Sequence, residues 1–364
     1  MKVMTIFGTR PEVIKLNLVV KLLDQHCEHI TVHTGFNLEE DLSRSLFDEL
    51  EVRKPDIHLE ITSKTFGGQI GEVISKIDDV LEEQNPDRIL ILGGTVSAMS
   101  AIIASGRKIP VFQMEAGARC FDDRIPEETN RRIVDHASTV LMPYTSHGKY
   151  NLLREGIAPE KIFVTGNPIK EILDTFADNI EQSNILEGLS VKPFEYFVAT
   201  LHRAENIESR ERLASIFEGL ADVAKKFGKN VLFAAHPQTA EKLQQYGIRP
   251  AGPNIRLLKS LGFFDFVKLQ KSSLAVLTDS GTVEDECSIL RIPNITLRAA
   301  TERRETLECG SNILSGTGSD AIIRAVELAI AQPAAWTPPA DYQVSNVSQT
   351  VSKIVLGFLH GSAS

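Results

Sequence analysis

The segment T-D-S-G-T-V-E-D-E, residues 278–286, places Ser280 and Gly281 at a predicted helix start. Free N–H groups and the positive end of the helix dipole attract a phosphate at such a position. Glu286 follows about a turn and a half later, and its carboxylate suits hydrogen bonds from ribose hydroxyls. Ser280 equally suits an ordinary helix cap, so this spacing alone leaves phosphate binding and capping open.

Carboxylates gather in two segments of the first half of the chain. Glu127 and Glu128 lie in P-E-E-T-N-R-R, in a predicted first helical turn where the dipole favours negative charge, and helix-start chemistry alone explains them. Glu115 ends a predicted apolar strand, so we expect it to be partly buried. Together these carboxylates form a group suited to proton exchange. Four basic residues are either their ion-pair partners or ligands of a diphosphate: Arg10, Lys15, Arg131 and Arg303.

Two histidines differ from the others because each directly follows a predicted buried strand of the second half. These are His202 and His236. A single histidine is more often a structural residue than a catalyst, but this placement directs both side chains toward the edge where ligands bind. His33 also ends a predicted strand, and its role is left undecided.

Short apolar runs alternate with longer segments of helical period, which is the pattern of βαβ units in a parallel sheet. The predicted fold class is therefore α/β. In the first half we predict strands at residues 3–7, 30–33, 89–92, 111–114, 140–142 and 162–164, and a first helix at 11–23. In the second half we predict strands at residues 196–199, 231–234, 255–257, 274–277 and 295–297.

The strand pattern starts twice, so we predict two Rossmann-like, doubly wound domains with a ligand cleft between them. The first comprises residues 1–172 and the second residues 173–344, and a helix within 345–364 is expected to pack back onto the first. Ligands of such sheets bind at the carboxyl ends of the strands. The polar segments described above lie there, as do Gly93-Gly94-Thr95 and Arg298.

Composition limits the classes of function. The 364 residues include 39 basic and 48 acidic side chains, a net charge of −9, which argues against a nucleic-acid-binding protein. No stretch resembles a signal peptide or membrane span, and the four cysteines form no C-x-x-C pair, so we expect a cytoplasmic protein without zinc or disulfides. G-x-G-x-x-G, Walker and dense carboxylate patterns are absent from the sequence, so we expect no metal and no redox cofactor.

Several motifs, taken in order along the chain, resemble the non-hydrolysing UDP-N-acetylglucosamine 2-epimerase family. They are K-V-M-T-I-F-G-T-R-P-E-V-I-K, E-A-G, P-E-E-x-N-R, L-H-R-A-E-N, A-A-H-P, L-T-D-S-G-T-V-E-D-E and T-E-R-R-E, and they span nearly the whole chain. The resemblance implies a GT-B-like fold, a UDP-acetamido sugar as partner, a homodimer and no cofactor. The implied isomerase inverts the carbon bearing the acetamido group by anti elimination of UDP and re-addition.

The resemblance also implies roles for individual residues. Glu115, Glu127 and His202 are the implied catalytic residues. Substrate or UDP contacts are implied for Arg10, Lys15, Arg131, Arg203, His236, Phe266, Ser280, Gly281, Glu286 and Arg303. Within this set the resemblance implies an aromatic contact near uracil, diphosphate binding at the start of the helix, and ribose binding by the carboxylate.

Two segments depart from the family pattern. The family's G-D-T loop carries an acid/base Asp, and Gly94 stands at its position here. Such groups contribute roughly 100- to 10,000-fold to a rate, so a slow enzyme is expected. Three explanations are open: a substituted variant of an active enzyme, a natural member that uses water or Glu115, and a binding protein that no longer epimerises. Phe36 replaces a glutamine that binds an activating UDP-N-acetylglucosamine in many members, which predicts weak or absent activation.

Four other functions are compatible with these motifs. Residues 120–136, C-F-D-D-R-I-P-E-E-T-N-R-R-I-V-D-H, look most like members that epimerise UDP-2-acetamido-2,6-dideoxy-L-hexoses such as UDP-N-acetyl-L-fucosamine. A hydrolysing epimerase would release free sugar and UDP, whereas a GT-B glycosyltransferase would form a disaccharide with an acceptor. A silent UDP-sugar binder, for which Gly94 argues, would leave its substrate unchanged.

Overall fold

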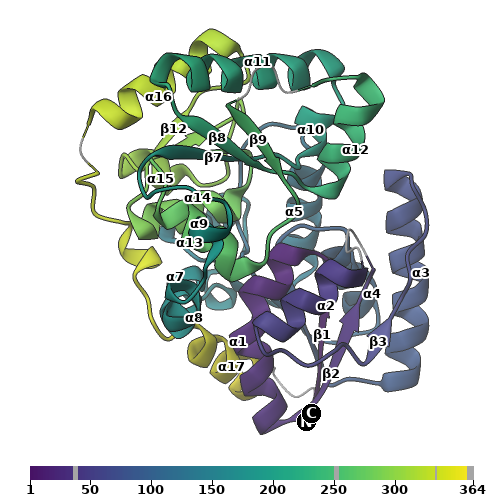
Figure 1. Cartoon of the computed structure of the whole chain (residues 1–364). Helices are drawn as coiled ribbons and strands as arrows, with labels where there is room; N and C mark the ends of the chain where they lie inside the picture. Colours follow the sequence, from purple (N-terminus) through teal and green to yellow (C-terminus); the bar gives the residue numbers. More distant parts are fainter. Residues whose placement is uncertain (36–39, 250–253, 333, 359–364) are drawn as a thin grey trace. The chain divides into compact units, whose positions relative to one another are not determined.

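The computed structural model describes residues 1–35, 40–249, 254–332 and 334–358 (Figure 1). The chain divides into two compact units, Met1–Leu173 with Asp341–Ser364 and Asp174–Ala340. Phe36, on which the prediction of weak activation rests, lies outside the described residues. Over the described ranges, no helix combines the length and apolarity needed to cross a lipid bilayer.

The first unit is built on a six-stranded parallel sheet with the order β3-β2-β1-β4-β5-β6. Its strands are β1 (Lys2–Phe7), β2 (Glu28–His33), β3 (Ile57–His58), β4 (Arg88–Leu92), β5 (Val111–Met114) and β6 (Val140–Met142). The inner strands are short apolar runs that are buried on both faces, as is typical of a parallel sheet covered by helices.

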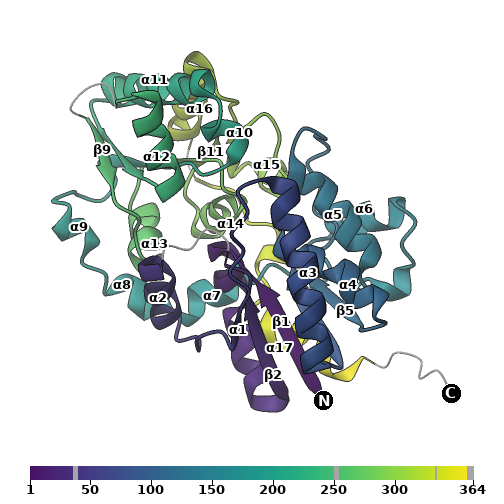
Figure 2. The same ribbon diagram turned by 90° about the vertical axis from the view of Figure 1, so that its right-hand side faces the viewer.

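Helices cover both faces of this first sheet. They are α1 (Arg10–His26), α2 (Glu40–Glu49), α3 (Phe66–Gln84), α4 (Ser100–Gly106), α5 (Pro126–Ala137), α6 (Ser146–Arg154) and α17 (Val347–Gly357), with 3-10 turns at Ser97–Met99, Pro159–Lys161 and Ala340–Tyr342. Helices α3, α4 and α5 pack on one face, where they share a core with β1 and β4, and Figure 2 shows α3 beside β1 and β2. Helix α17 packs against α1, and Arg88 donates to the backbone oxygens of Val355 and Phe358.

The second unit has its own six-stranded parallel sheet, with the order β12-β11-β10-β7-β8-β9. Its strands are β7 (Tyr196–Thr200), β8 (Asn230–Ala234), β9 (Ile255–Leu258), β10 (Val276–Thr278), β11 (Asn294–Thr296) and β12 (Asn312–Leu314). Alternate residues of β7 enter two separate cores, Phe197 and Ala199 on one face and Tyr196 and Val198 on the other.

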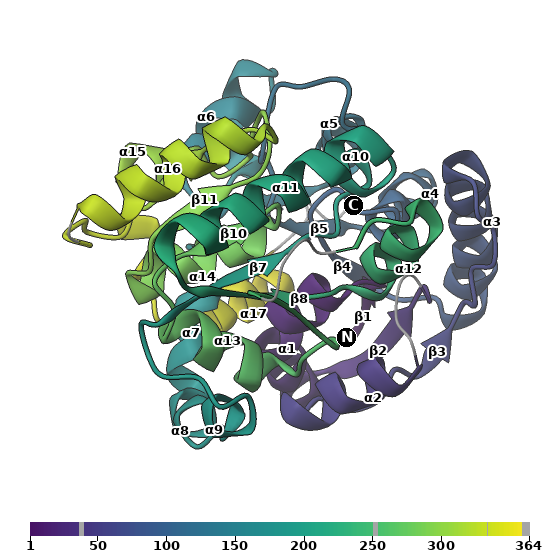
Figure 3. The same cartoon turned by 45° about the horizontal axis from the view of Figure 1, so that its top comes forward.

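The second unit has its own set of helices. They are α8 (Ala177–Glu181), α9 (Ile185–Gly188), α10 (Ala204–Ile207), α11 (Arg210–Phe227), α12 (Pro237–Tyr246), α13 (Phe263–Lys271), α14 (Gly281–Leu290), α15 (Arg304–Glu308) and α16 (Ser319–Ala331), and α7 (Ile169–Thr175) crosses the division between the units. Helices α11 and α16 lie side by side on one core, as Figure 3 shows, and α13 and α14 pack on the other.

Both sheets place their strands in the same relative order, third-second-first-fourth-fifth-sixth in sequence. This is the doubly wound Rossmann order, so the predicted pair of Rossmann-like parallel sheets is confirmed. The topological switch points lie between β1 and β4 and between β7 and β10, where ligands of such sheets bind. The loops at these points carry Arg10, Gly94, His202 and Ser280.

One predicted strand differs from the structure, and two strands of the structure were not predicted. Residues 162–164 lie along β6 but form only an isolated parallel bridge, between Ile162 and Leu141, with a backbone hydrogen bond from the Phe163 N–H to the Leu141 oxygen at 2.9 Å. Val164 is 37% exposed, as expected for a segment with no further strand packed beside it. Strands β3 and β12 were not predicted, because both are very short edge strands in which polar residues interrupt the apolar run.

Candidate active site

The switch point of the first unit is held together by one buried carboxylate, that of Glu12 in the first turn of α1. Its Oε2 atom accepts hydrogen bonds from the backbone N–H groups of Gly8 (3.0 Å) and Thr9 (2.8 Å). Its Oε1 atom accepts a hydrogen bond from the Thr95 hydroxyl (2.8 Å), so Glu12 ties the loops after β1 and β4 together. The T-x-x-E spacing of Thr9 and Glu12 is the sequence signal for this arrangement, although we predicted no role for Glu12.

Burial raises the pKa of Glu12 from its ordinary 4.5 to about 6, although hydrogen bonds from Thr9, Thr95 and Gly8 lower it. Between these two values the folded protein binds more protons than the unfolded chain, so Glu12 makes the free energy of unfolding fall as pH rises. We expect wild type to lose about 2 kcal/mol of stability relative to Glu12→Gln between about pH 4.5 and pH 7. Urea unfolding of both proteins measures this difference, and parallel pH profiles would refute the assignment.

Glu115 directly follows β5 and forms an ion pair with Lys15 of α1, with 2.8 Å between Nζ and Oε2. Only 3% of the Lys15 side chain and 12% of the Glu115 side chain are exposed. The Lys15 ammonium also lies 5.5 Å from the centre of the Tyr144 ring. Glu115 has a φ of 58°, in the left-handed region that glutamate rarely adopts. Such strain in a polar residue at a strand end is typical of functional sites.

Gly94 lies against α5 at a distance that leaves no room for a side chain. A Cβ on Gly94 would lie 2.8 Å from the backbone nitrogen and 3.0 Å from the Cα of Arg131. Gly93 has a φ of 66°, but Gly94 is not in the left-handed region, so Gly94 provides space rather than backbone freedom. An aspartate at this position would therefore require the loop or the start of α5 to shift.

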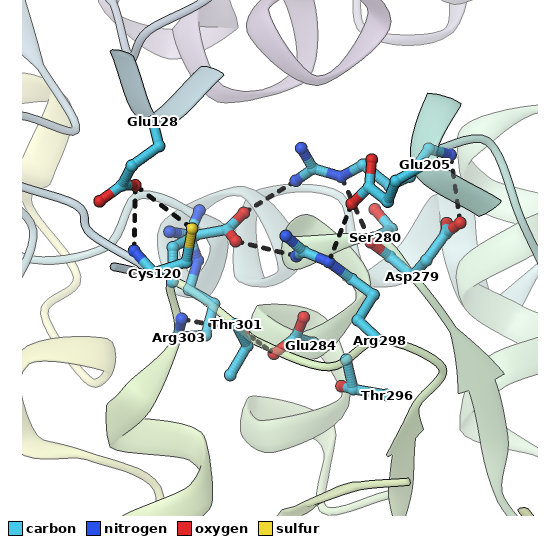
Figure 4. A network of polar contacts seen from close by, with 12 residues as sticks. Cys120, Glu128, Glu205, Asp279, Ser280, Glu284, Thr296, Arg298, Thr301 and Arg303 are labelled. Atoms are coloured by element: carbon cyan, nitrogen blue, oxygen red, sulfur yellow. Dashed lines mark hydrogen bonds and ion pairs between the residues drawn. The ribbon is translucent and has the colours of Figure 1, made fainter. Parts of the chain in front are cut away.

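The two carboxylates at the start of α5 have different surroundings. Glu128 is fully buried and accepts hydrogen bonds from the backbone N–H groups of Cys120 and Phe121, both at 3.1 Å, and Figure 4 shows it beside Cys120. It also binds Arg131, whose Nη1 lies 3.0 Å from Oε2. Glu127 is only half-buried. Glu128 is thus a structural carboxylate, and the predicted arginine of α5 is at least partly used to neutralise it.

The loops after β7 and β10 are joined by the buried carboxylate of Asp279. It accepts hydrogen bonds from the backbone N–H groups of His202 and Arg203, both at 3.1 Å, and from the Asn206 amide at 2.9 Å. The His202 Nδ1 atom lies 3.4 Å from Asp279 Oδ1. Burial lowers the pKa of His202 below its ordinary value, and the charge of Asp279 opposes this shift. His202 is therefore held at the switch point of the second unit as a largely neutral imidazole.

Ser280 and Gly281 lie at the start of α14, as predicted. Ser280 is the N-cap residue, but its side chain makes no capping hydrogen bond, so the simple capping interpretation does not hold. A Cβ on Gly281 would lie 2.9 Å from Glu302 Oε1 and 3.7 Å from Arg303 Cζ. Charged groups thus closely surround the first turn of α14, where the helix dipole favours an anion.

A chain of ion pairs surrounds this first turn, and Figure 4 shows its members Arg298 and Arg303. Glu302 joins two arginines, because its Oε1 lies 2.8 Å from Arg203 Nη2 and its Oε2 lies 2.8 Å from Arg298 Nη1. Arg303 pairs with Asp285 of α14, with 2.9 Å between Nε and Oδ1. Arg298 lies two residues after β11, and it was expected among the polar residues at the strand ends, where ligands bind. We predicted no individual role for Arg298 or for Glu302.

The other predicted residues of the second unit lie near this turn or deeper in the fold. His236 is the N-cap residue of α12, and its ring centre is 6.0 Å from that of His202. Glu286 is buried within α14 and accepts a hydrogen bond from the Gln270 amide at 2.7 Å. Phe266 is partly buried on α13 and packs on the core that contains Val283. The structure therefore brings the two histidines together and places Glu286 about a turn and a half further along the helix.

Comparison with known proteins gives a consistent result. The sequence pattern of the UDP-N-acetylglucosamine 2-epimerase family matches residues 21–356. The UDP-N-acetylglucosamine 2-epimerase of Methanocaldococcus jannaschii is 38% identical over 350 residues, which are 93% of this chain and 95% of that protein. The UDP-2,3-diacetamido-2,3-dideoxy-D-glucuronate 2-epimerase of Pseudomonas aeruginosa is 33% identical over 97% of this chain and 98% of that protein.

A solved structure agrees with these sequence relatives. The fold is similar to a crystal structure of Methanocaldococcus jannaschii UDP-GlcNAc 2-epimerase in complex with UDP-GlcNAc and UDP. The TM-score is 0.93, the sequence identity is 36%, and the match covers 98% of this chain and 99% of that one.

Proposed function

Because this chain belongs to the UDP-N-acetylglucosamine 2-epimerase family, we propose that it inverts C2 of UDP-N-acetylglucosamine to give the manno epimer. It is a non-hydrolysing UDP-sugar 2-epimerase, and the predicted family and isomerase class are confirmed. Its relatives are named for two different acetamido sugars, and one of them was crystallised in complex with UDP-GlcNAc and UDP. A UDP-linked 2-acetamido sugar is therefore the substrate class that we propose.

The proposed reaction exchanges one proton at C2. A base removes the C2 proton while the C1–O bond to UDP breaks, which gives a glycal and UDP. UDP then adds back at C1, and an acid delivers a proton to the opposite face of C2. We assign these two tasks to Glu115 and Glu127. The observation that carries the proposal is the buried ion pair of Glu115 with Lys15, because it holds one carboxylate in a single orientation.

The departing UDP is the second chemical requirement. Its leaving oxygen gains negative charge as the C1–O bond breaks, and fixed positive groups stabilise that charge best. We assign this task to the start of α14, at Ser280 and Gly281, and to Arg203 and Arg303 beside it. A largely neutral His202 suits a hydrogen-bond donor or a proton carrier at the same loop.

The test is proton exchange at C2. We expect UDP-N-acetylglucosamine incubated with the protein in deuterated water to incorporate deuterium at C2 while the manno epimer appears, both followed by NMR. Parallel reactions with UDP-N-acetyl-L-fucosamine identify the preferred sugar. Release of free sugar would indicate a hydrolysing enzyme. Unchanged substrate, despite measurable UDP-sugar binding, would indicate a silent binder and overturn the proposal.

Three finer properties stay predictions. The L-fucosamine branch rests on residues 120–136, the homodimer rests on the family, and the cytoplasmic location rests on the cysteine pattern. The division of roles among the site residues is likewise our proposal. We expect UDP-N-acetylglucosamine to be the better of the two substrates, since the Methanocaldococcus jannaschii relative carries that name.

A further inference from the structure

Arg298 is a buried guanidinium whose hydrogen-bonding capacity is mostly unused. It lies two residues after the end of β11, is 2% exposed, and donates one hydrogen bond from Nη1 to Glu302 Oε2. Its Nε and Nη2 atoms are buried and have no hydrogen-bond partner within the described ranges. The Nε atom forms an ion pair with Glu205, whose Oε1 lies 3.5 Å away, a distance that is too long for a hydrogen bond. Figure 4 shows the Arg298 guanidinium close to Glu205.

Buried donors without partners are rare, because removing them from water costs free energy that only a hydrogen bond returns. A guanidinium presents its donors in a rigid fork that fits two oxygens of one phosphate. Arg298 therefore points to a ligand that offers several acceptor oxygens. The low exposure of Arg298 is no objection, since Ser280 at 7% and Arg303 at 4% are similarly buried around the same turn.

The position of Arg298 joins it to the start of α14. Glu302 binds Arg298 through Oε2, and its Oε1 would lie 2.9 Å from a Cβ on Gly281. The same Oε1 accepts a hydrogen bond from Arg203 Nη2 at 2.8 Å. The Glu302 carboxylate thus holds the guanidinium groups of Arg203 and Arg298 beside the free N–H groups at the start of α14. Both guanidinium groups therefore lie where the helix start favours an anion.

We propose that Arg298 is a further ligand of the nucleotide diphosphate and that Glu302 is the positioning residue that holds it. This inference rests on the proposed function, since it names a second contact of the same UDP-linked substrate. In the proposed arrangement, Arg203 and Arg298 bind diphosphate oxygens from the two sides of Glu302. Burial and the charge of Glu302 both raise the pKa of Glu284, which lies in the first turn of α14, so this carboxyl repels the diphosphate less.

The test is an affinity series of uridine, UMP and UDP, measured by calorimetry on the whole protein. For Arg298→Gln we expect UDP to bind roughly 10- to 100-fold more weakly, the loss typical of hydrogen bonds to charged groups. Uridine affinity should change by less than about twofold, because uridine has no phosphate. Equal losses for uridine and UDP would mean a structural role, and unchanged UDP affinity would mean no contact, so either result overturns the assignment.

Two further variants keep the test decisive. Arg298→Lys keeps the charge and the bond to Glu302 but loses the planar fork, so its loss of UDP affinity should be smaller; it decides the question if Arg298→Gln does not fold. Arg304→Gln is the matched control, because Arg304 is 70% exposed, pairs with Glu308 and should leave UDP binding unchanged. If wild type binds no UDP at all, the proposed function is wrong. If all variants bind UDP normally, only the assignment of Arg298 as a ligand is wrong.

Discussion

Replacing Glu115 by glutamine is expected to slow deuterium exchange at C2 by about 100- to 10,000-fold, the usual contribution of a positioned acid or base. Glutamine has the same shape and still accepts a hydrogen bond from Lys15, so the loop after β5 should keep its position. It has no carboxylate to take the C2 proton. The measurement is the initial rate of C2 exchange, by NMR, at saturating UDP-N-acetylglucosamine.

The Glu115→Gln result needs a comparison that separates chemistry from binding. UDP affinity should stay within about threefold of wild type, because the diphosphate is assigned to groups of the second unit. Glu82→Gln is the matched control, since Glu82 is an exposed carboxylate that pairs only at the surface with Arg107. If Glu115→Gln exchanged C2 as fast as Glu82→Gln, Glu115 would not be the group that transfers the proton.

Replacing Gly94 by aspartate is expected to increase the rate of C2 exchange by at least about 100-fold and to lower stability at the same time. The gain is the lower limit for restoring an acid/base carboxylate. The loss, about 1 to 3 kcal/mol, follows from overpacking, because a Cβ at this position would lie 2.8 Å from the Arg131 backbone nitrogen. Exchange rates and urea unfolding of the same preparation measure both effects.

Gly94→Ala separates the two effects of that substitution. Alanine adds the same Cβ without a carboxylate, so we expect it to lose a similar amount of stability and to gain no rate. A rate increase in Gly94→Ala would attribute the gain to the shift of α5 instead. If the Gly94→Asp variant exchanged C2 no faster than wild type, catalysis by this protein would not depend on a carboxylate at position 94.

The sheets were predictable because their strands are fully buried apolar runs. Strands β5 and β6 match the predicted residues 111–114 and 140–142, since burial on both faces gives an uninterrupted hydrophobic signal. Residues 162–164 show the limit of that signal, because this apolar run lies beside β6 but pairs with it only in an isolated bridge. Edge strands β3 and β12 show the converse, since they pair with a neighbouring strand although each is very short and contains a polar residue.

The sequence predicted where the site residues lie along the chain, but not which of them contact one another. Loops after strands could be found from the sequence, and they carry Glu115, His202 and Ser280. Spacing alone could not distinguish Glu127 from Glu128, because the rotation of α5 decides which of two adjacent carboxylates is buried, and only the family resemblance selected Glu127. Likewise, an ion pair such as Glu302 with Arg203 joins residues 99 positions apart, and no local pattern encodes it.

The return of the chain to the first unit has a consequence for its synthesis. Helix α17 packs on α1, and the backbone oxygens that Arg88 binds belong to Val355 and Phe358. These residues are made after the second unit, which is complete once Ala340 has been made. Since domains generally fold as units, we expect the second unit to be able to fold before the first has all of its residues.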